Sequence, residues 1–278
     1  KIEVSLVGAS STWKRGGFGF RMRSRYGKVV ALGNTAFDNL CVTVIDESGL
    51  PTAENKPIGH VDNKVTDVLF IGNSYTYFND LPSMVHEMTA DAGIRASFAM
   101  YANGGYSLRE FYEDLQNGDA ELKKALRLAD IVIFQDYGGA TAYSADYIEL
   151  LASRLDPCVK LYFYPYKNAT APRAALDRFI DLGLPVTVIR TPDLYQSTLT
   201  KYKVNYLIDD GPKHPQPILS HLFAMQIAAT IFGIDPAKVD HSGYTGALAS
   251  MTSDEQAAFF ADVCGRIETL RTEPLPHS

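Results

Sequence analysis

The sequence predicts an α/β fold, in which a five-stranded parallel sheet lies between layers of helices and follows a small β-rich N-terminal extension. Three observations lead to this prediction. From about residue 65 onward, short apolar runs alternate with segments of helical periodicity. Glycine or polar residues follow most apolar runs, where strands would end. Residues 131–134 are apolar throughout, as expected of a parallel strand buried on both faces.

The expected strands and helices follow one another regularly along the chain. The strands are expected at residues 67–71, 96–102, 131–134, 159–164 and 185–189. The helices are expected near residues 81–88, 108–115, 122–128, 144–154, 171–182, 217–232 and 252–267. Ser107 with Glu110 three residues later has the pattern of a helix N-terminus, and Gly233 is expected to end its helix. Residues 234–251 are expected to be mainly loop.

The first 64 residues differ in pattern from the rest and are expected to be a separate β-rich extension and linker, with the main domain at residues 65–278. Alternating residues predict short strands near 2–6 and 18–23, and β-formers gather at 28–32 and 40–45. Residues 47–64 contain two prolines and a glycine and are expected to be the linker.

Composition excludes several classes of function. The chain has 278 residues, 46% of them hydrophobic, and a net charge of −6, which gives no basic surface for nucleic acid. No apolar run is long enough to cross a bilayer. Three widely spaced cysteines form neither a metal-binding pattern nor a disulfide framework. The chain starts without a signal-peptide pattern, so a mature or trimmed form is expected, and a secreted or extracellular location is slightly favoured.

Gly72-Asn73-Ser74 lies where the first strand of the main domain gives way to a helical pattern. Open α/β sheets bind their ligands at the carboxyl ends of the strands. A helix that begins at such a serine also directs backbone N–H groups and the positive end of its dipole toward the ligand. The alternative is an ordinary turn, in which Asn73 and Ser74 only satisfy backbone groups.

Polar or glycine residues at later strand ends and loops supply the other parts of a serine hydrolase. A serine needs a base that removes its proton, and histidine is the side chain that titrates nearest neutrality, so His214 is the expected base. Asp210 is expected to orient its imidazole, with Asp209 as the alternative. The expected oxyanion-hole donors are the Ser74 amide, a glycine amide at 104 or 105, and the Gln135 side chain.

Other interpretations of the histidines remain open at this point. A single histidine before a proline is more often a loop residue that caps a helix. His86 lies in an expected helix and is interpreted as a partly exposed surface residue. His221 and His241 are not expected to be the base.

Four blocks of residues resemble the SGNH hydrolases, also called GDSL-type esterases. Gly72-Asn73-Ser74-Tyr75-Thr76 resembles their first block, in the variant with Asn before the serine. Asn103-Gly104-Gly105-Tyr106-Ser107-Leu108 resembles the second block, whose glycine amide lines the oxyanion hole, a role that the resemblance gives to Gly105. Phe134-Gln135-Asp136 falls where the third block usually has Asn, and Asp210 to Pro215 resembles the last block with one extra residue between Asp and His.

The resemblance covers about residues 66–270 and implies a three-layer, flavodoxin-like fold. It also implies hydrolysis of acyl esters by a Ser74–His214–Asp210 triad, with no metal and no cofactor. Ser74, Gly105 and Gln135 would form the oxyanion hole.

The expected substrate is an O-acetyl ester of a carbohydrate or polysaccharide. The sequence has 16 tyrosines, and aromatic rings can stack on sugars. Asn73, Tyr75, Tyr106 and Tyr137 are the expected substrate-binding residues. The alternatives are a lipid esterase or thioesterase, a non-catalytic glycan-binding module on the same scaffold, and a structural α/β domain without a site. No nucleic-acid partner is expected, and the oligomeric state is left open.

Overall fold

The structure is a computed structural model that describes residues 21–23, 29–31, 65–136, 142–156, 158–167 and 171–273. Contacts between Cα atoms divide the chain into two units, Lys1–Lys64 and Val65–Ser278. In the first unit, β1 (Arg21–Arg23) pairs antiparallel with β2 (Val29–Ala31). The strands expected near residues 2–6 and 40–45 and the linker at 47–64 lie outside the described residues.

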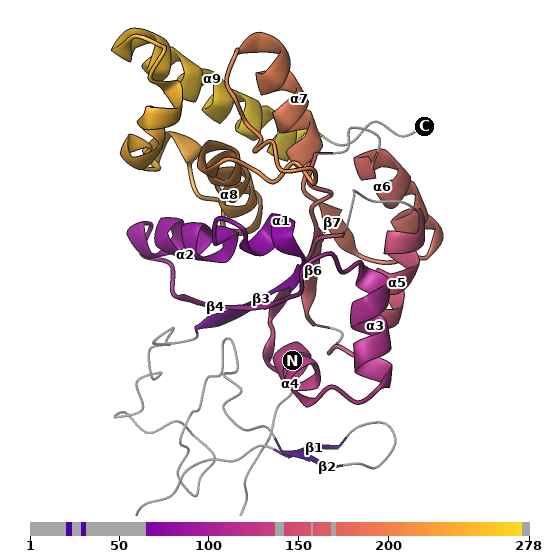
Figure 1. Ribbon diagram of the computed structural model, residues 1–278. Coiled ribbons are helices and arrows are strands. Elements are labelled where there is room, and N and C mark those ends of the chain that lie inside the picture. The colour runs from indigo at the N-terminus through magenta and orange to yellow at the C-terminus, as the bar shows by residue number, and fades with distance from the viewer. Residues whose placement is uncertain are drawn as a thin grey trace, which may run out of the picture. The chain divides into compact units, whose positions relative to one another are not determined.

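A five-stranded parallel sheet forms the centre of the second unit (Figure 1). Its strands are β3 (Thr66–Gly72), β4 (Ala96–Ala102), β5 (Ile131–Phe134), β6 (Lys160–Phe163) and β7 (Val186–Val188), in the order β4-β3-β5-β6-β7. Every pairing is parallel. The predicted parallel α/β fold is therefore confirmed.

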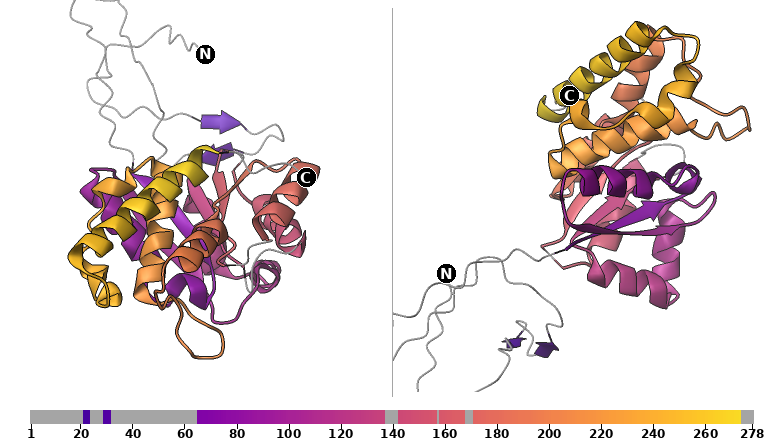
Figure 2. Two further views of the ribbon diagram at one scale, coloured as in Figure 1. Left: turned by 90° about the horizontal axis from the view of Figure 1, so that it is seen from above. Right: turned by 90° about the vertical axis from the view of Figure 1, so that its left-hand side faces the viewer.

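Two layers of helices cover the sheet (Figures 1 and 2). On one face lie α3 (Leu108–Gln116), α4 (Ala120–Leu128), α5 (Ala142–Ala152) and α6 (Ala171–Asp181). On the other lie α1 (Ser74–Tyr77), α2 (Leu81–Asp91), α7 (Thr191–Lys201), α8 (Pro217–Phe232) and α9 (Ser253–Thr272). Alternation along β3 separates the two cores: Val68 and Phe70 face the α2–α8 side, and Leu69 and Ile71 face the α3–α6 side.

Helix α8 is the most deeply buried helix in the described residues. Every residue from Ile218 to Ala229 is buried, because α8 lies between α2 on one side and α9 on the other (Figure 1). A helix enclosed in this way is apolar on all its faces. Gly233 ends it with a φ of 69°, as predicted.

The structure differs from the sequence prediction in two places. Helix α7 was not expected, although Pro192 stands at its first turn, a position that suits proline. The segment 234–251, expected to be loop, contains the two 3-10 helices η1 (Pro236–Lys238) and η2 (Ser242–Leu248). The capping box of Ser107 and Glu110 is confirmed at the start of α3. Among the described helices, none combines the length and the apolar character that spanning a bilayer requires.

Candidate active site

Asn73 fixes the turn between β3 and α1. Its side-chain oxygen accepts a hydrogen bond of 3.1 Å from the Tyr75 backbone N–H, which makes it the N-cap of α1. Its side-chain nitrogen donates to the Tyr106 carbonyl at 2.8 Å. Asn73 is completely buried, so it holds the turn from inside. Ser74 is consequently the first residue of α1.

Gln135, at the end of β5, belongs to a buried hydrogen-bond network behind this turn. Its side-chain oxygen accepts from the Asn73 backbone N–H at 3.0 Å and from the Thr76 hydroxyl at 3.1 Å. Its Nε2 donates to the Asp136 carbonyl. The Thr76 oxygen lies 2.6 Å from the Tyr164 hydroxyl, which must be the donor when Thr76 donates to Gln135. The Gln135 side chain therefore joins the end of β5 to the start of α1. One of its two amide N–H groups donates a hydrogen bond within the protein.

The structure distinguishes the two aspartates before His214. The Asp210 carboxylate contacts His214 Nδ1 through Oδ2. Its Oδ1 accepts from the backbone N–H groups of Lys213 at 2.9 Å and His214 at 3.2 Å. Asp209 instead forms an ion pair with the Lys213 ammonium group. The hydrogen bond from His214 lowers the pKa of the Asp210 carboxyl below its usual value.

The His214 ring is stacked on Phe78, with ring centroids 4.3 Å apart and an angle of 8° between the planes. Phe78 comes four residues after Ser74, and its N–H donates to the Ser74 carbonyl. Residues four apart lie on the same face of a helix. The stacking therefore brings His214 to the face of α1 that begins with Ser74.

The Ser74 hydroxyl and His214 Nε2 are unpaired in the described part of the chain. His214 Nε2 is buried and has no hydrogen-bond partner there. The Ser74 hydroxyl likewise makes no hydrogen bond to a described residue, so the structure places the two side chains near the same helix face without a direct bond between them.

Two tyrosines and a lysine hold the loop that carries His214. Tyr75 donates through its hydroxyl to the Pro212 carbonyl at 2.9 Å. Tyr166 donates to the Lys213 carbonyl at 3.0 Å, and Lys167 to the same oxygen at 3.3 Å. The sequence analysis missed Tyr166 and Lys167, and their position just after β6 was the available signal.

The Tyr75 ring is part of the protein interior. It is 7% exposed and is stacked on Tyr166, with centroids 4.0 Å apart. Burial raises the pKa of Tyr166 above its ordinary value. Because the Tyr75 ring is covered, the expectation that it stacks on substrate is corrected: it supports the His214 loop.

Gly104 and Gly105 form an exposed turn after β4. Gly105 has a φ of 74°, a left-handed conformation that glycine adopts without strain. A Cβ at Gly104 would lie 2.9 Å from the Tyr77 hydroxyl, which places this turn beside α1. The backbone N–H groups of Ser74 and Gly105 have no acceptor among the described residues.

The remaining predicted residues lie in different surroundings. Tyr106 is partly buried, and its ring lies 5.3 Å from Phe111. Tyr137 lies outside the described residues. His86 is exposed on α2, as predicted, and His221 and His241 contact each other away from these residues. In the described ranges, no three or more His, Cys, Asp or Glu residues are placed to hold a metal ion.

Among known proteins, the chain resembles solved structures in its fold. No protein-family model matches the chain, and no curated protein matches it. A solved DUF4886 family protein from Bacteroides uniformis superposes on 76% of this chain and 98% of its own, with a TM-score of 0.58 and 15% sequence identity.

Two further solved structures are more distant. A protein of Slackia heliotrinireducens, provisionally assigned to the SGNH hydrolases, matches 60% of this chain and 100% of its own with 21% identity and a TM-score of 0.47. A protein of Parabacteroides merdae, provisionally named a GDSL-like lipase, matches 60% and 96% with 11% identity and a TM-score of 0.42. The second unit therefore has the α/β fold of the DUF4886 family protein, and its structural neighbours include proteins of the SGNH and GDSL hydrolase group.

Proposed function

We propose that the second unit is a serine esterase that hydrolyses acyl esters, with Ser74 as the nucleophile, His214 as the base and Asp210 as the residue that orients the base. One observation carries this proposal. Asp210 contacts Nδ1 of His214, and the opposite nitrogen is buried without a partner among the described residues, on the helix face that begins with Ser74. This is the arrangement in which a carboxylate fixes the imidazole tautomer and leaves Nε2 free to accept a proton.

The proposed reaction uses only side chains and backbone of this chain. Ser74 Oγ attacks the ester carbonyl while His214 Nε2 takes the hydroxyl proton. The imidazolium then protonates the leaving alcohol, and an acyl-enzyme remains on Ser74. Water, deprotonated by His214, attacks this acyl group. The imidazolium then returns the proton to Ser74 Oγ as the bond to the acyl group breaks, which releases the carboxylic acid and restores both residues. Asp210 stabilises the imidazolium at both steps.

The developing oxyanion would be bound at the start of α1. The N–H groups of Ser74 and Gly105 have no acceptor in the described part of the chain and belong to segments joined by the Asn73 to Tyr106 hydrogen bond. Aimed donors of this kind contribute roughly 3–4 kcal/mol each to transition-state binding. Gln135 can take part only through its second N–H, since the first donates to the Asp136 carbonyl.

An O-acetyl group on a carbohydrate is the proposed substrate. Tyr77 and Phe78 beside the proposed nucleophile are 38% and 41% exposed, and aromatic faces of this kind stack on sugar rings. Tyr106 is partly exposed across the Asn73 hydrogen bond. In this proposal Asn73 and Tyr75 support the site from inside, while Tyr77, Phe78 and Tyr106 meet the sugar.

Replacing the proposed nucleophile tests the reaction directly. Ser74→Ala should lower kcat for a chromogenic acetate ester by about 10⁴-fold or more and leave the circular dichroism spectrum unchanged. Ser153→Ala, at an exposed serine in the turn after α5, is the matched control and should retain native activity. Native-like turnover by the Ser74 variant would rule out this nucleophile.

The adjacent aspartates give a matched pair of variants. Asp210→Asn should lower kcat by about 10³- to 10⁴-fold, because the amide no longer holds the correct tautomer of His214. Asp209→Asn removes only the ion pair with Lys213 and should change kcat less than threefold or so. Equal losses in both variants would contradict the assignment of Asp210.

Two further measurements separate the alternative functions. A higher rate with acetyl than with octanoyl esters is expected, and acetate should be released from acetylated oligosaccharides; the reverse chain-length preference would indicate a lipid esterase or thioesterase. An organophosphonate should label Ser74 covalently. Binding of acetylated glycan without labelling or turnover would indicate a glycan-binding module instead.

A further inference from the structure

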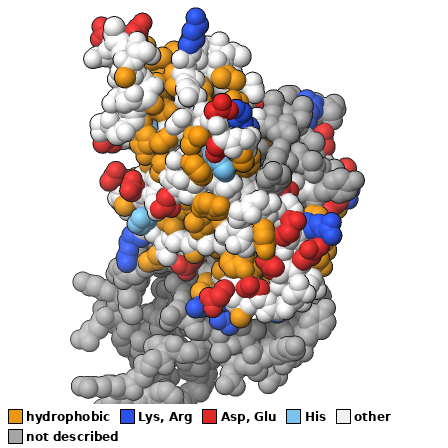
Figure 3. All heavy atoms as spheres, in the orientation of Figure 1, with side chains coloured by type: hydrophobic (Ala, Val, Ile, Leu, Met, Phe, Trp, Pro, Cys, Tyr) orange, Lys and Arg blue, Asp and Glu red, His pale blue; other side chains and the backbone are white. Residues whose placement is uncertain are grey.

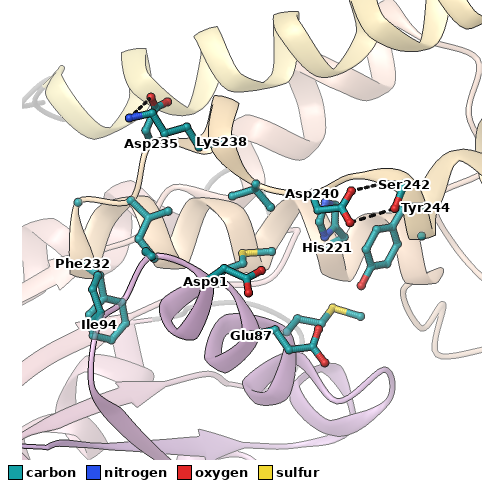
Figure 4. A pocket seen from close by; sticks show the side chains of 17 residues that line it. Glu87, Asp91, Ile94, His221, Phe232, Asp235, Lys238, Asp240, Ser242 and Tyr244 are labelled. Atoms are coloured by element: carbon teal, nitrogen blue, oxygen red, sulfur yellow. Dashed lines mark hydrogen bonds and ion pairs between the residues drawn. The ribbon is translucent and has the colours of Figure 1, made fainter.

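A cavity lies away from the proposed catalytic residues, between α2, α8 and the segment that contains η1 and η2 (Figure 4). Its volume is about 760 Å³, which falls within the range of small-molecule binding sites. None of the residues proposed for catalysis lines it. The cavity is therefore a candidate binding site in its own right.

Part of the cavity lining is apolar. Met84 and Met88 from α2, Phe232 at the end of α8, Ile94 and Val239 contribute to it. Methionine side chains adapt to ligands of different shape. This lining suits an aryl or alkyl group.

The rim of the cavity is acidic. Four carboxylates line it, those of Glu87, Asp91, Asp235 and Asp240, against the single cation of Lys238. Figure 3 shows one face of the molecule, on which Asp and Glu side chains lie next to hydrophobic side chains.

Two of these carboxylates have local partners, and two have none in the described part of the chain. Asp235 lies 3.8 Å from the Lys238 ammonium group, and Asp240 accepts from the backbone N–H and the hydroxyl of Ser242 at 2.9 and 3.0 Å. Glu87 and Asp91 form no hydrogen bond or ion pair with a described residue. They stand one turn apart on α2, where like charges repel each other.

A buried histidine at one end of the cavity adds an unpaired polar atom. His221 is 1% exposed and is stacked on Tyr244, with centroids 3.8 Å apart. Its Nε2 lies 3.0 Å from His241 Nδ1, while its own Nδ1 has no partner within the described chain. When Nε2–H donates to His241, the Nδ1 atom is an acceptor without a donor. His221 lines the cavity, so a ligand N–H group that reached this buried atom would satisfy it.

We propose that this cavity binds a small organic cation, in which an ammonium group is joined to an aryl or alkyl group. The apolar part would occupy the surface formed by Met84, Met88 and Phe232. The ammonium group would be attracted by Glu87 and Asp91 and would have an acceptor in His221. Charge complementarity selects the cation: an anion would meet four carboxylates, and a neutral molecule would gain nothing from the charges of Glu87 and Asp91, which are exposed on α2.

Three probes with the same apolar group test this selection. Isothermal titration calorimetry on the full chain would compare 4-phenylbutylammonium, 4-phenylbutanol and 4-phenylbutyrate at pH 7.5. The cation should bind at least tenfold more tightly than the alcohol, with no measurable binding of the carboxylate. Equal affinity for the alcohol, preference for the anion, or no binding of the cation would overturn the proposal.

Matched variants then locate the binding site. The double variant Glu87→Gln with Asp91→Asn should lower the affinity for 4-phenylbutylammonium by about tenfold. The control removes the same two charges elsewhere, with Glu121→Gln and Asp254→Asn at exposed positions outside the cavity, and should bind the cation as the native chain does. Equal losses in both double variants would contradict this site. Turnover of an acetate ester should be unchanged in both, since neither touches the residues proposed for catalysis.

Discussion

Acid should destabilise the second unit through His221. Burial, and then the nearby His241, lower the pKa of His221 from 6.5 to about 3, while Asp240 opposes this shift. The folded state therefore keeps His221 neutral, whereas the unfolded state takes up a proton as the pH falls below 6.5. Stability from this group is fully present above that pH and is lost as the pH falls toward 3.

The size of the loss follows from the linkage relation. Each pH unit between the two pKa values costs about 1.4 kcal/mol. Between pH 7 and pH 5 the unfolded state gains almost one proton at this position, so the free energy of unfolding should fall by about 2 kcal/mol. For a domain of this size, that corresponds to a melting temperature lower by about 4–8 °C.

Urea unfolding at a series of pH values, followed by circular dichroism, would measure this slope. His221→Gln removes the titrating group, so its unfolding free energy should fall by about 2 kcal/mol less than the native value between pH 7 and pH 5. Met225→Ala, at another fully buried position of α8, should lower stability without changing the slope. The same slope in the native chain and in His221→Gln would refute the assignment to His221.

Three buried positions provide further tests by urea unfolding. In Gly72→Ala the new Cβ would lie 2.4 Å from the Thr76 hydroxyl and 2.8 Å from Gln135 Oε1, so stability should fall by about 1–3 kcal/mol; an unchanged value would mean that the turn relaxes freely. Tyr164→Phe removes a buried hydroxyl that bonds Thr76 and should cost about 1 kcal/mol. Phe111→Ala empties a fully buried site in the core on the α3–α6 side and should cost about 3–5 kcal/mol; a cost below about 1 kcal/mol would contradict tight packing there.

Two strands were predictable for different reasons. Residues 131–134 coincide with β5, which is buried throughout and therefore leaves a continuous apolar signal in the sequence. Residues 96–102 coincide with β4, a partly exposed strand at the edge of the sheet, whose end is marked by the glycines that follow it. Helix α7 has a weaker signal, since its buried apolar residues, Pro192, Leu194 and Tyr195, all lie in the first half of the helix. Its formation depends on packing against α9 and α8, and such tertiary contacts cannot be inferred from local periodicity.

For the candidate site, the sequence indicated the residue types and their order but not the direction of each side chain. Asp209 and Asp210 are equivalent in the sequence, and only the folded loop determines which carboxylate contacts His214. Gln135 bonds residues about 60 positions away, and Tyr75 is covered by Tyr166. These orientations arise from contacts between distant segments.

The end of β6 determines how the proposed nucleophile and base lie relative to each other. Two tyrosines follow this strand, Tyr164 and Tyr166, with Pro165 between them. Tyr164 bonds Thr76, in the same short helix as Ser74, whereas Tyr166 bonds the Lys213 carbonyl next to His214. Tyr166 has a φ of 50°, a left-handed conformation that costs a non-glycine residue free energy and persists where surrounding contacts fix it. Because a single strand end positions both segments, the distance between Ser74 and His214 depends on β6 as much as on either residue's own loop.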